Sequence, residues 1–430
     1  MSKNFTKLFY LFYCCIFIAC QNSEPGVNTP VFQSFPVKSA SEIEITDFLP
    51  ASECESCHPD HFDEWSHSMH ASAMKDPIFL RGWNDEQELH PDTGERFCIQ
   101  CHSPVSFITG TYLNNISTAE DIEDEEIPAV IQEGIGCDYC HSITRSSPGV
   151  VIQDNLVATA EYNLYPGEGI KYGSIESPSE NDYHTSVYNP LFKSSGVCLP
   201  CHNMTVRGNP AEMTFTEWED ASEFSMGNRI SCQECHMPLT IRKAAINGPT
   251  REVHKHIFVG VDLDLSQPAE QSPQYNAVID LLKSAVTLEF GTLIDSINIG
   301  DLFSIPVVVS SNTGHSLPSG VSFAREAWLE LIVRIDDSIL FQSGLLASNT
   351  DSLKLSDNNL LLFTSYLISD TLTGKITSSV SETMRIIDHT LKASTQKSHL
   401  YAFQLSADQI PENSNGEIAI QLRMLFRPFK

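Results

Sequence analysis

Apolar and polar residues alternate most regularly in the C-terminal third of the chain. From Ala327 to Ile335 every second residue is apolar and would lie on one face of a strand, and residues 418–426 repeat this pattern. Other segments with strand-like composition are residues 302–309, 360–368 and 399–405. Short strands separated by turn-rich pieces predict an antiparallel β-sandwich over residues 285–430, here called the strand region.

An apolar run at residues 8–18 follows two lysines near the N-terminus. A basic segment followed by about ten apolar residues predicts an export signal, because such a run is too short to span a bilayer. The ending Phe-Ile-Ala-Cys, at Cys20, resembles a bacterial lipoprotein signal. This resemblance implies a signal peptide over residues 1–20 and a lipid on Cys20; an ordinary secretory signal cut nearby is the alternative.

The segment between the signal and the strand region has no long periodic pattern. Residues 21–47 are polar and contain proline, which is typical of a tether. From residue 48 to 262, here called the motif region, turn-forming residues are frequent. We therefore expect short helices and irregular chain there, with little regular secondary structure.

The cysteines carry the candidate chemistry. Of thirteen, three lie in the signal and the other ten form five Cys-x-x-Cys-His motifs. The motifs are Cys54, Cys57 and His58; Cys98, Cys101 and His102; Cys137, Cys140 and His141; Cys198, Cys201 and His202; and Cys232, Cys235 and His236. This is the attachment signature of c-type haem. Two thiols at this spacing can add to one porphyrin, and the following histidine becomes the proximal iron ligand.

Other uses of Cys-x-x-Cys fit poorly. A structural zinc site needs two such pairs or a distant histidine pair, and a disulfide framework would not place a histidine after every second cysteine. A thioredoxin-like redox pair would occur once. The sequence therefore predicts five covalently attached haems with their iron. The fold class is α+β: a haem-packed, mostly helical or irregular domain over residues 48–262, then the β-sandwich.

The remaining histidines are candidates for the distal iron position. Ten of the fifteen lie outside the motifs. Imidazole on both sides of the iron suits electron transfer, whereas an open position suits substrate binding. His254 and His256 would share a face if they lie on a strand. Methionine is the rival ligand, and no spacing favours it.

Several short elements resemble the multihaem cytochromes typified by cytochrome c-554, cytochrome c-552 and hydroxylamine oxidoreductase. They span about residues 50–345 and occur in the order of that group. The elements are Trp65 to Ala73 (W-x-x-S-x-H-A-x-A), Gly134 to Ile143, Glu217-Trp218 with Cys232 to Pro238, His256 to Gly260, and Asn312 to Gly320 (N-x-G-H-x-L-P-x-G). The resemblance implies distal ligation by His70, His184, His256 and His315. For the fifth haem His67, His90 and His254 compete, and His254 is taken forward.

Net charge limits the partners. The chain carries a formal charge of −29, which argues against nucleic acid or an anionic membrane surface as a direct partner. It fits a basic protein partner or solubility alone. The expected location is the periplasm or cell surface, with attachment to the membrane by lipid.

Three functions are compatible with these residues. The preferred one is electron transfer to redox proteins such as a quinol-oxidising complex, a reductase or an extracellular acceptor. The second is a haem enzyme that converts a small nitrogen or sulfur species at one five-coordinate iron. For the enzyme interpretation the sequence offers no candidate catalytic residue, and it contains no Cys-x-x-Cys-Lys motif. The third is a haem subunit that docks into a larger assembly through its β-sandwich.

Overall fold

The structure is a computed structural model that describes residues 36–91, 94–111, 116, 118–153, 156–206, 209–221, 230–346, 348, 351–414 and 416–429. The predicted signal, its Cys20 and the first part of the tether lie outside the described residues. Residues 36–430 form one compact unit. No helix within the described ranges is long and apolar enough to cross a membrane.

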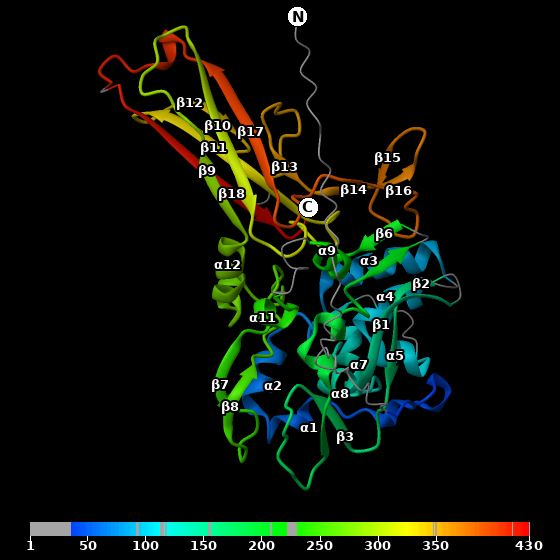
Figure 1. Cartoon of the computed structure of the whole chain (residues 1–430). Coiled ribbons are helices and arrows are strands. Elements are labelled where there is room, and N and C mark those ends of the chain that lie inside the picture. Colours follow the sequence, from blue (N-terminus) through cyan, green and yellow to red (C-terminus); the bar gives the residue numbers. More distant parts are fainter. Residues whose placement is uncertain are drawn as a thin grey trace, which may run out of the picture. The chain divides into compact units, whose positions relative to one another are not determined.

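Short helices dominate the motif region (Figure 1). They are η1 (Ala40–Glu42), η2 (Ile45–Asp47), α1 (Ser52–Glu55), α2 (Pro59–Ser66), α3 (Pro77–Leu89), α4 (Gly94–His102), α5 (Pro104–Thr109), α6 (Ala119–Ile122), α7 (Ala129–Gln132), α8 (Cys137–His141), η3 (Pro190–Lys193), η4 (Ser195–Val197), α9 (Thr214–Asp220) and α11 (Cys232–His236). The longest, α3, begins where the Asp76 carboxylate accepts the Phe79 N–H at 2.8 Å and Pro77 occupies the first turn.

Strands are more frequent in the motif region than the sequence suggests. They are β1 (Ile143–Gln153), β2 (Leu156–Leu164), β3 (Ile170–Gly173), β4 (Thr185–Tyr188), β5 (Met204–Val206), β6 (Asn209–Glu212), β7 (Leu239–Lys243) and β8 (Thr250–His254). The first hairpin continues into a four-stranded sheet, β1-β2-β5-β6. The expectation of little regular structure was wrong here because Ser, Pro and Gly interrupt the apolar alternation of β1, which pairs with β2 through two register shifts.

One apolar cluster stabilises part of the motif region. It joins α3, α4, α5, α7, α8 and β1 through buried side chains that include Leu80, Trp83, Ile99, Val105 and Ile131. Residues 36–47, assigned to the tether from sequence, pack here too: Ile43 is buried and the Lys38 N–H donates to the Leu164 carbonyl. Around the fourth motif the cluster is far smaller and consists of Leu199 and Phe215 with Trp218 beside them.

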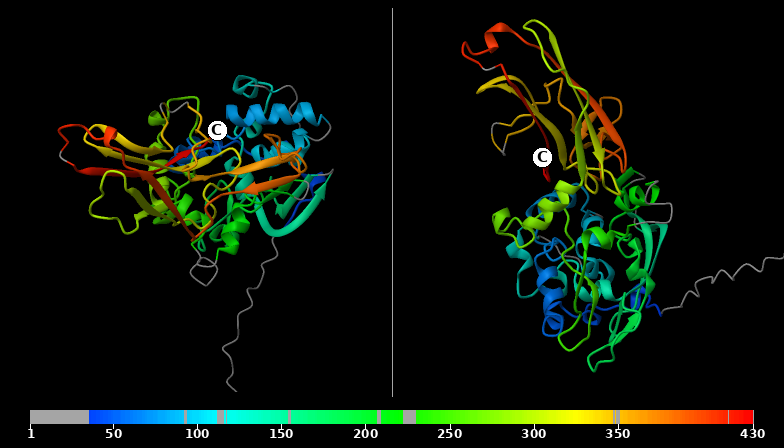
Figure 2. Two further views of the ribbon diagram at one scale, coloured as in Figure 1. Left: turned by 90° about the horizontal axis from the view of Figure 1, so that it is seen from above. Right: turned by 60° about the vertical axis from the view of Figure 1, so that its left-hand side comes forward.

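The strand region follows η5 (Ala269–Gln271) and α12 (Tyr275–Ser284). Its elements are β9 (Val286–Phe290), β10 (Leu302–Ser311), β11 (Glu326–Ile335), β12 (Ser338–Ser343), β13 (Leu362–Phe363), β14 (Ser365–Asp370), β15 (Lys375–Thr377), β16 (Arg385–Asp388), β17 (Gln396–Gln404), η6 (Ala407–Gln409) and β18 (Ile418–Arg427). The sheets are antiparallel: β17-β10-β9, β12-β11-β13 with β18 on β11, and β15-β14-β16. Figure 2 shows them from two further directions.

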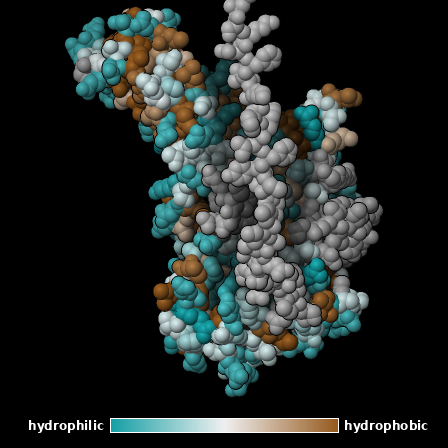
Figure 3. Space-filling view, viewed as in Figure 1, coloured by the Kyte–Doolittle hydropathy of each residue, from teal (hydrophilic) through white to brown (hydrophobic). Residues whose placement is uncertain are grey.

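The first two of these sheets share one apolar core. Every second residue of β10, from Phe303 to Val309, meets the β11 side chains from Ala327 to Ile335, and most of these are fully buried. Strands predicted near residues 302–309, 327–335, 399–405 and 418–426 are confirmed as β10, β11, β17 and β18. On the molecular surface drawn in Figure 3, hydrophobic and hydrophilic residues are mixed.

Candidate functional site

Four of the five motifs lie on or beside a short helix. The second, third and fifth lie within α4, α8 and α11, the first overlaps α1, and the fourth follows η4 in a turn. Residues three apart on a helix point to the same side, so the two thiols of each pair can approach one edge of a porphyrin. All ten cysteines keep part of their surface accessible.

The proximal histidines are oriented by backbone carbonyls. In four of them Nδ1 lies within hydrogen-bond distance of a carbonyl oxygen: His58 to Ala244 at 2.7 Å, His102 to Ala73 at 2.9 Å, His141 to Tyr172 at 2.6 Å and His236 to Val259 at 2.5 Å. A proton on Nδ1 that is donated to a carbonyl leaves the lone pair on Nε2. These four rings are therefore set to bind a metal through Nε2.

The fourth proximal histidine has a different neighbour. His202 Nδ1 lies 3.9 Å from a carboxylate oxygen of Glu212, a buried residue at the end of β6. The Thr214 N–H donates to that carboxylate at 3.2 Å. Burial raises the pKa of Glu212, and burial together with the neighbouring His315 lowers the pKa of His202.

Each of four motif histidines faces a histidine from elsewhere in the chain. The ring centroids are 6.4 Å apart for His58 and His184, 6.2 Å for His141 and His256, 6.4 Å for His202 and His70, and 6.2 Å for His236 and His315. With metal–imidazole bonds of about 2 Å, two rings on opposite sides of one ion have centroids about 6 Å apart. The four pairs therefore fit a shared iron.

Burial keeps most of these imidazoles neutral, the form that binds a metal. Burial lowers the pKa of His70 to about 3 and those of His102 and His236 to about 4. Burial also moves the pKa of His256 well below its ordinary value.

The predicted fifth distal ligand does not face a motif histidine in the described residues. His254 ends β8, and its Nδ1 lies 2.5 Å from the Met237 carbonyl. Of its competitors, His67 is exposed beside the Asp63 carbonyl, and His90 lies just after α3. His102 instead has Phe79 stacked on its ring, with centroids 3.8 Å apart.

His61 also lies near two of the paired rings, 6.1 Å from His58 and 4.5 Å from His256. A helix rises only about 1.5 Å per residue, so His61 in α2 cannot reach the face of a haem opposite His58. Burial lowers the pKa of His61 to about 4. It packs on the His256 ring rather than replacing it.

Two glycines allow the His70 segment to approach the third motif. Gly134 has φ +67°, and a Cβ there would come within 2.7 Å of the His70 carbonyl oxygen, which accepts the Ile135 N–H at 3.1 Å. A Cβ on Gly136 would collide with the Glu133 carboxylate. Trp65 donates from its indole to the Ile135 carbonyl at 2.9 Å. The glycines before Cys137 thus position a histidine that faces the fourth motif.

Thiols from different motifs lie next to one another. Hydrogen bonding and burial raise the pKa of the Cys137, Cys101 and Cys198 thiols, whose respective partners are Cys54, Cys201 and Cys232. The sites of the third and fourth motifs are linked through Phe258, whose ring centroid lies 5.7 Å from that of His256 and 4.4 Å from that of His70. The first motif therefore adjoins the third, the third adjoins the fourth, and the fourth adjoins both the second and the fifth.

Comparison with known proteins agrees with this geometry. Residues 53–142 match a family model described as cytochrome c554 and c-prime. The fold is similar to that of a pentahaem cytochrome c552 from Thermochromatium tepidum, with a TM-score of 0.63 and 19% identity over 90% of this chain and 93% of that chain. The family match and the fold similarity both agree with the resemblance to multihaem c-type cytochromes that the sequence motifs show. None of the curated proteins compared matches it.

The donor set fits covalent haem c. The motif cysteines would attach the porphyrins, and the motif histidines would bind the iron ions. His184, His256, His70 and His315 stay predictions for the opposite side of the iron, supported by the ring spacings. Haem c supplies one-electron chemistry when bound, at a potential that its ligands and surroundings set.

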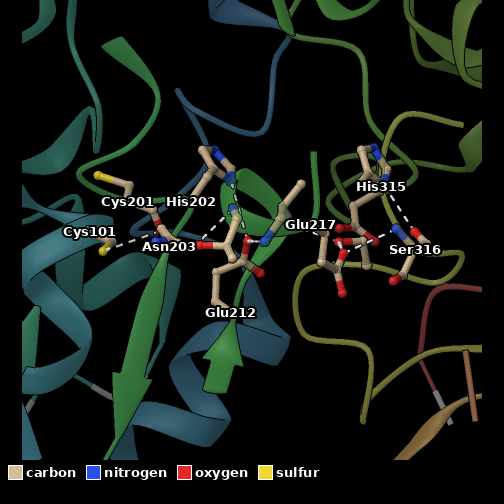
Figure 4. Close-up of polar contacts among 12 residues, drawn as sticks. Cys101, Cys201, His202, Asn203, Glu212, Glu217, His315 and Ser316 are labelled. Carbon is tan, nitrogen blue, oxygen red and sulfur yellow. Dashed lines mark hydrogen bonds and ion pairs between the residues drawn. The ribbon is translucent and has the colours of Figure 1, made fainter. Parts of the chain in front are cut away.

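Sequence reasoning missed several residues of the candidate site. Figure 4 shows Glu212 beside His202, and Glu217 beside His315 and Ser316. Glu217 belongs to the Glu-Trp element noted in the sequence, which was the only signal for it. Phe79 and Glu212 have no local pattern, because only the fold brings them to His102 and His202.

Proposed function

We propose that this chain is an electron-transfer protein that carries five covalently bound c-type haems outside the cytoplasm. The observation that carries the proposal is the closeness of the motifs, whose neighbouring thiols and the Phe258 ring between His256 and His70 link all five haem sites into one connected series. Four of the five sites pair two imidazoles, which leave no position for substrate on the iron, and closely spaced haems of this kind pass electrons among themselves.

The proposed architecture is a haem-packed domain followed by a β-sandwich. The shared core of β10 and β11 supports the second part, and the limited side-chain clusters near the first, fourth and fifth motifs support the first. The net charge of −29 would steer the protein towards basic patches on a quinol-oxidising complex, a reductase or an extracellular acceptor.

Haem count and spin state test the proposal directly. The full-length protein should contain five haems by pyridine haemochrome assay, and its air-oxidised EPR spectrum should be dominated by low-spin ferric signals. A high-spin signal from the His102 haem in the unaltered protein would show an accessible iron there. Turnover of nitrite, hydroxylamine or sulfite at that iron would replace electron transfer with the enzyme interpretation.

Single ligand variants test the four histidine pairs. His70→Ala, His184→Ala, His256→Ala and His315→Ala should each convert one haem from low spin to high spin, because each removes one of two imidazoles. His254→Ala and His61→Ala are matched controls that remove a buried or half-buried histidine without opening an iron. If a control variant produced as much high-spin haem as the ligand variants, the assigned pairing would be contradicted.

The proposed lipid anchor is tested at Cys20. Cells expressing the protein and fed labelled palmitate should incorporate label into the unaltered chain, and Cys20→Ala should abolish it and release the exported protein from membranes. Equal membrane recovery of both forms in high salt would refute attachment through Cys20.

A further inference from the structure

One distal candidate reaches its haem site from the other region of the chain. His315 lies in residues 312–320, a loop of the strand region, yet its ring faces His236 of the fifth motif at 6.2 Å. Within its own region the loop is fastened by Leu317 and Leu391, whose backbones exchange hydrogen bonds of 2.8 and 2.9 Å. This attachment shapes the loop but does not hold it against the motif region.

The contact with the motif region centres on Glu217 of α9. One oxygen of its carboxylate accepts the Ser316 N–H at 3.1 Å and the Ser319 hydroxyl at 2.7 Å (Figure 4). The Thr214 hydroxyl, also on α9, lies 2.7 Å from the Ser319 hydroxyl. Helix α9 therefore binds the loop through hydrogen bonds on the C-terminal side of His315, starting at Ser316.

Backbone hydrogen bonds connect these contacts to the His315 imidazole. His315 Nδ1 lies 2.9 Å from the Ser316 carbonyl oxygen, so the ring donates to the residue whose N–H Glu217 holds. The Thr313 hydroxyl bonds the His315 carbonyl at 2.5 Å from the other side. A shift of Ser316 would move the ring, because both are parts of one hydrogen-bonded turn.

We propose that Glu217 is a positioning residue that holds the His315 loop in ligating position, so that the sixth ligand of the fifth haem depends on contact between the two regions. The proposal rests on the proposed function insofar as it takes His315 as an iron ligand. Removing the carboxylate would leave the buried Ser316 N–H without its acceptor and the Ser319 hydroxyl with only the Thr214 hydroxyl, which favours displacement of the loop.

The test compares spin states in the full-length protein with all haems attached. His315→Ala defines the spectrum of an open fifth haem. Glu217→Ala should reproduce a large part of that added high-spin signal, and adding imidazole should restore the low-spin form. Glu217→Gln should stay low spin, because its amide oxygen can still accept both donors. The double variant His315→Ala with Glu217→Ala should show no more high-spin haem than His315→Ala alone.

Glu86→Ala is the matched control. Glu86 also accepts donors from the strand region, the Ser379 hydroxyl at 2.8 Å and the Val380 N–H at 3.0 Å, but no distal histidine lies in that loop. It should not produce the His315→Ala spectrum. If Glu217→Ala keeps the low-spin spectrum while His315→Ala loses it, the positioning role is refuted and the proposed function stands. An unchanged His315→Ala spectrum would refute the ligation and with it this proposal.

Should Glu217→Ala fail to accumulate, Ser319→Ala provides a second variant. It removes only one of the two donors and leaves α9 intact. It should give a smaller high-spin fraction than His315→Ala that imidazole reverses. A spectrum identical to that of the unaltered protein would count against the proposal.

Discussion

The two regions of this chain bury apolar surface in different ways. In the strand region, β10 and β11 supply an extended core of their own, in which Ile305, Val309, Leu329 and Leu331 are fully buried. In the motif region the main cluster surrounds α3 to α8, whereas the described residues around the fourth motif form a small cluster of Leu199 and Phe215 with Trp218. The motif cysteines remain partly accessible throughout.

The difference indicates what stabilises each region. A side-chain core of this kind can stabilise a sheet pair without help, whereas the apolar cluster of the motif region does not extend over the fourth and fifth motifs, which need another source of apolar contact. Five haems would supply that contact in the motif region. The strand region should therefore fold independently of haem attachment, and the motif region should not.

The largest effect should follow from preventing haem attachment. In a variant with all ten motif cysteines changed to alanine, the motif region should lose much of its amide protection, because the haem contacts around its motifs cannot form. Hydrogen exchange followed by mass spectrometry should still show protected amides in β10, β11, β17 and β18. Native-like protection of α8 and α11 in this variant would refute the comparison.

A cavity in the strand-region core should have the next largest effect. Leu331→Ala, at a fully buried position of β11, should lower the stability of the strand region by about 2–5 kcal/mol, because a leucine truncation loses both transfer energy and packing. Denaturant unfolding monitored by tryptophan fluorescence measures it. The exposed Leu400→Ala is the matched control and should change stability by less than about 0.5 kcal/mol.

The sequence predicted the strand region well because its signal is local. Alternation alone located β11 and β18, strand-like composition located β10, and a buried face on one strand requires a partner sheet. In the motif region each attachment motif could also be recognised from a few consecutive residues. The residues that lie beside each motif in the fold could not, because they come from distant parts of the sequence. The contacts of Cys54 with Cys137 and of Cys101 with Cys201 join segments that no spacing relates.

The distal histidines show the same limit. His70, His184, His256 and His315 were selected by resemblance and by position near motifs, and the fold places each opposite a motif histidine. His254 was selected because it shares a strand pattern with His256, but β8 ends at His254 and the chain bends before His256. The two-residue period of a strand therefore does not predict the relative side-chain directions of His254 and His256.

A buried carboxyl should make the motif region the more pH-sensitive of the two. Burial raises the pKa of Glu133 from its ordinary 4.5 to about 7, although its carboxylate accepts the Ala51 N–H at 2.8 Å. The folded state thus binds this proton more tightly than the unfolded state, so stability is highest below pH 4.5 and falls as the pH rises towards 7. The expected loss is about 3 kcal/mol.

Glu133→Gln should flatten this part of the profile while keeping an acceptor for Ala51. The measurement is urea unfolding of the motif region, followed by haem absorbance between pH 4.5 and 8. Amide exchange of β11 in the strand region provides the internal control, which should not change with the substitution. An unchanged slope in Glu133→Gln would show that other groups carry the pH dependence.

The smallest effect should come from loosening one contact between the regions. Ser379, in the loop between β15 and β16, donates its hydroxyl to Glu86 of α3 at 2.8 Å. Ser379→Ala removes that bond to a buried carboxylate and should cost about 1–1.5 kcal/mol of coupling between the regions. Calorimetry should then show the motif and strand transitions further apart. Ser369→Ala, which loses only an exposed 3.4 Å bond to Lys375, should leave both transitions in place. A single unchanged transition in both variants would mean that the two regions unfold as one unit, held together by contacts other than Glu86.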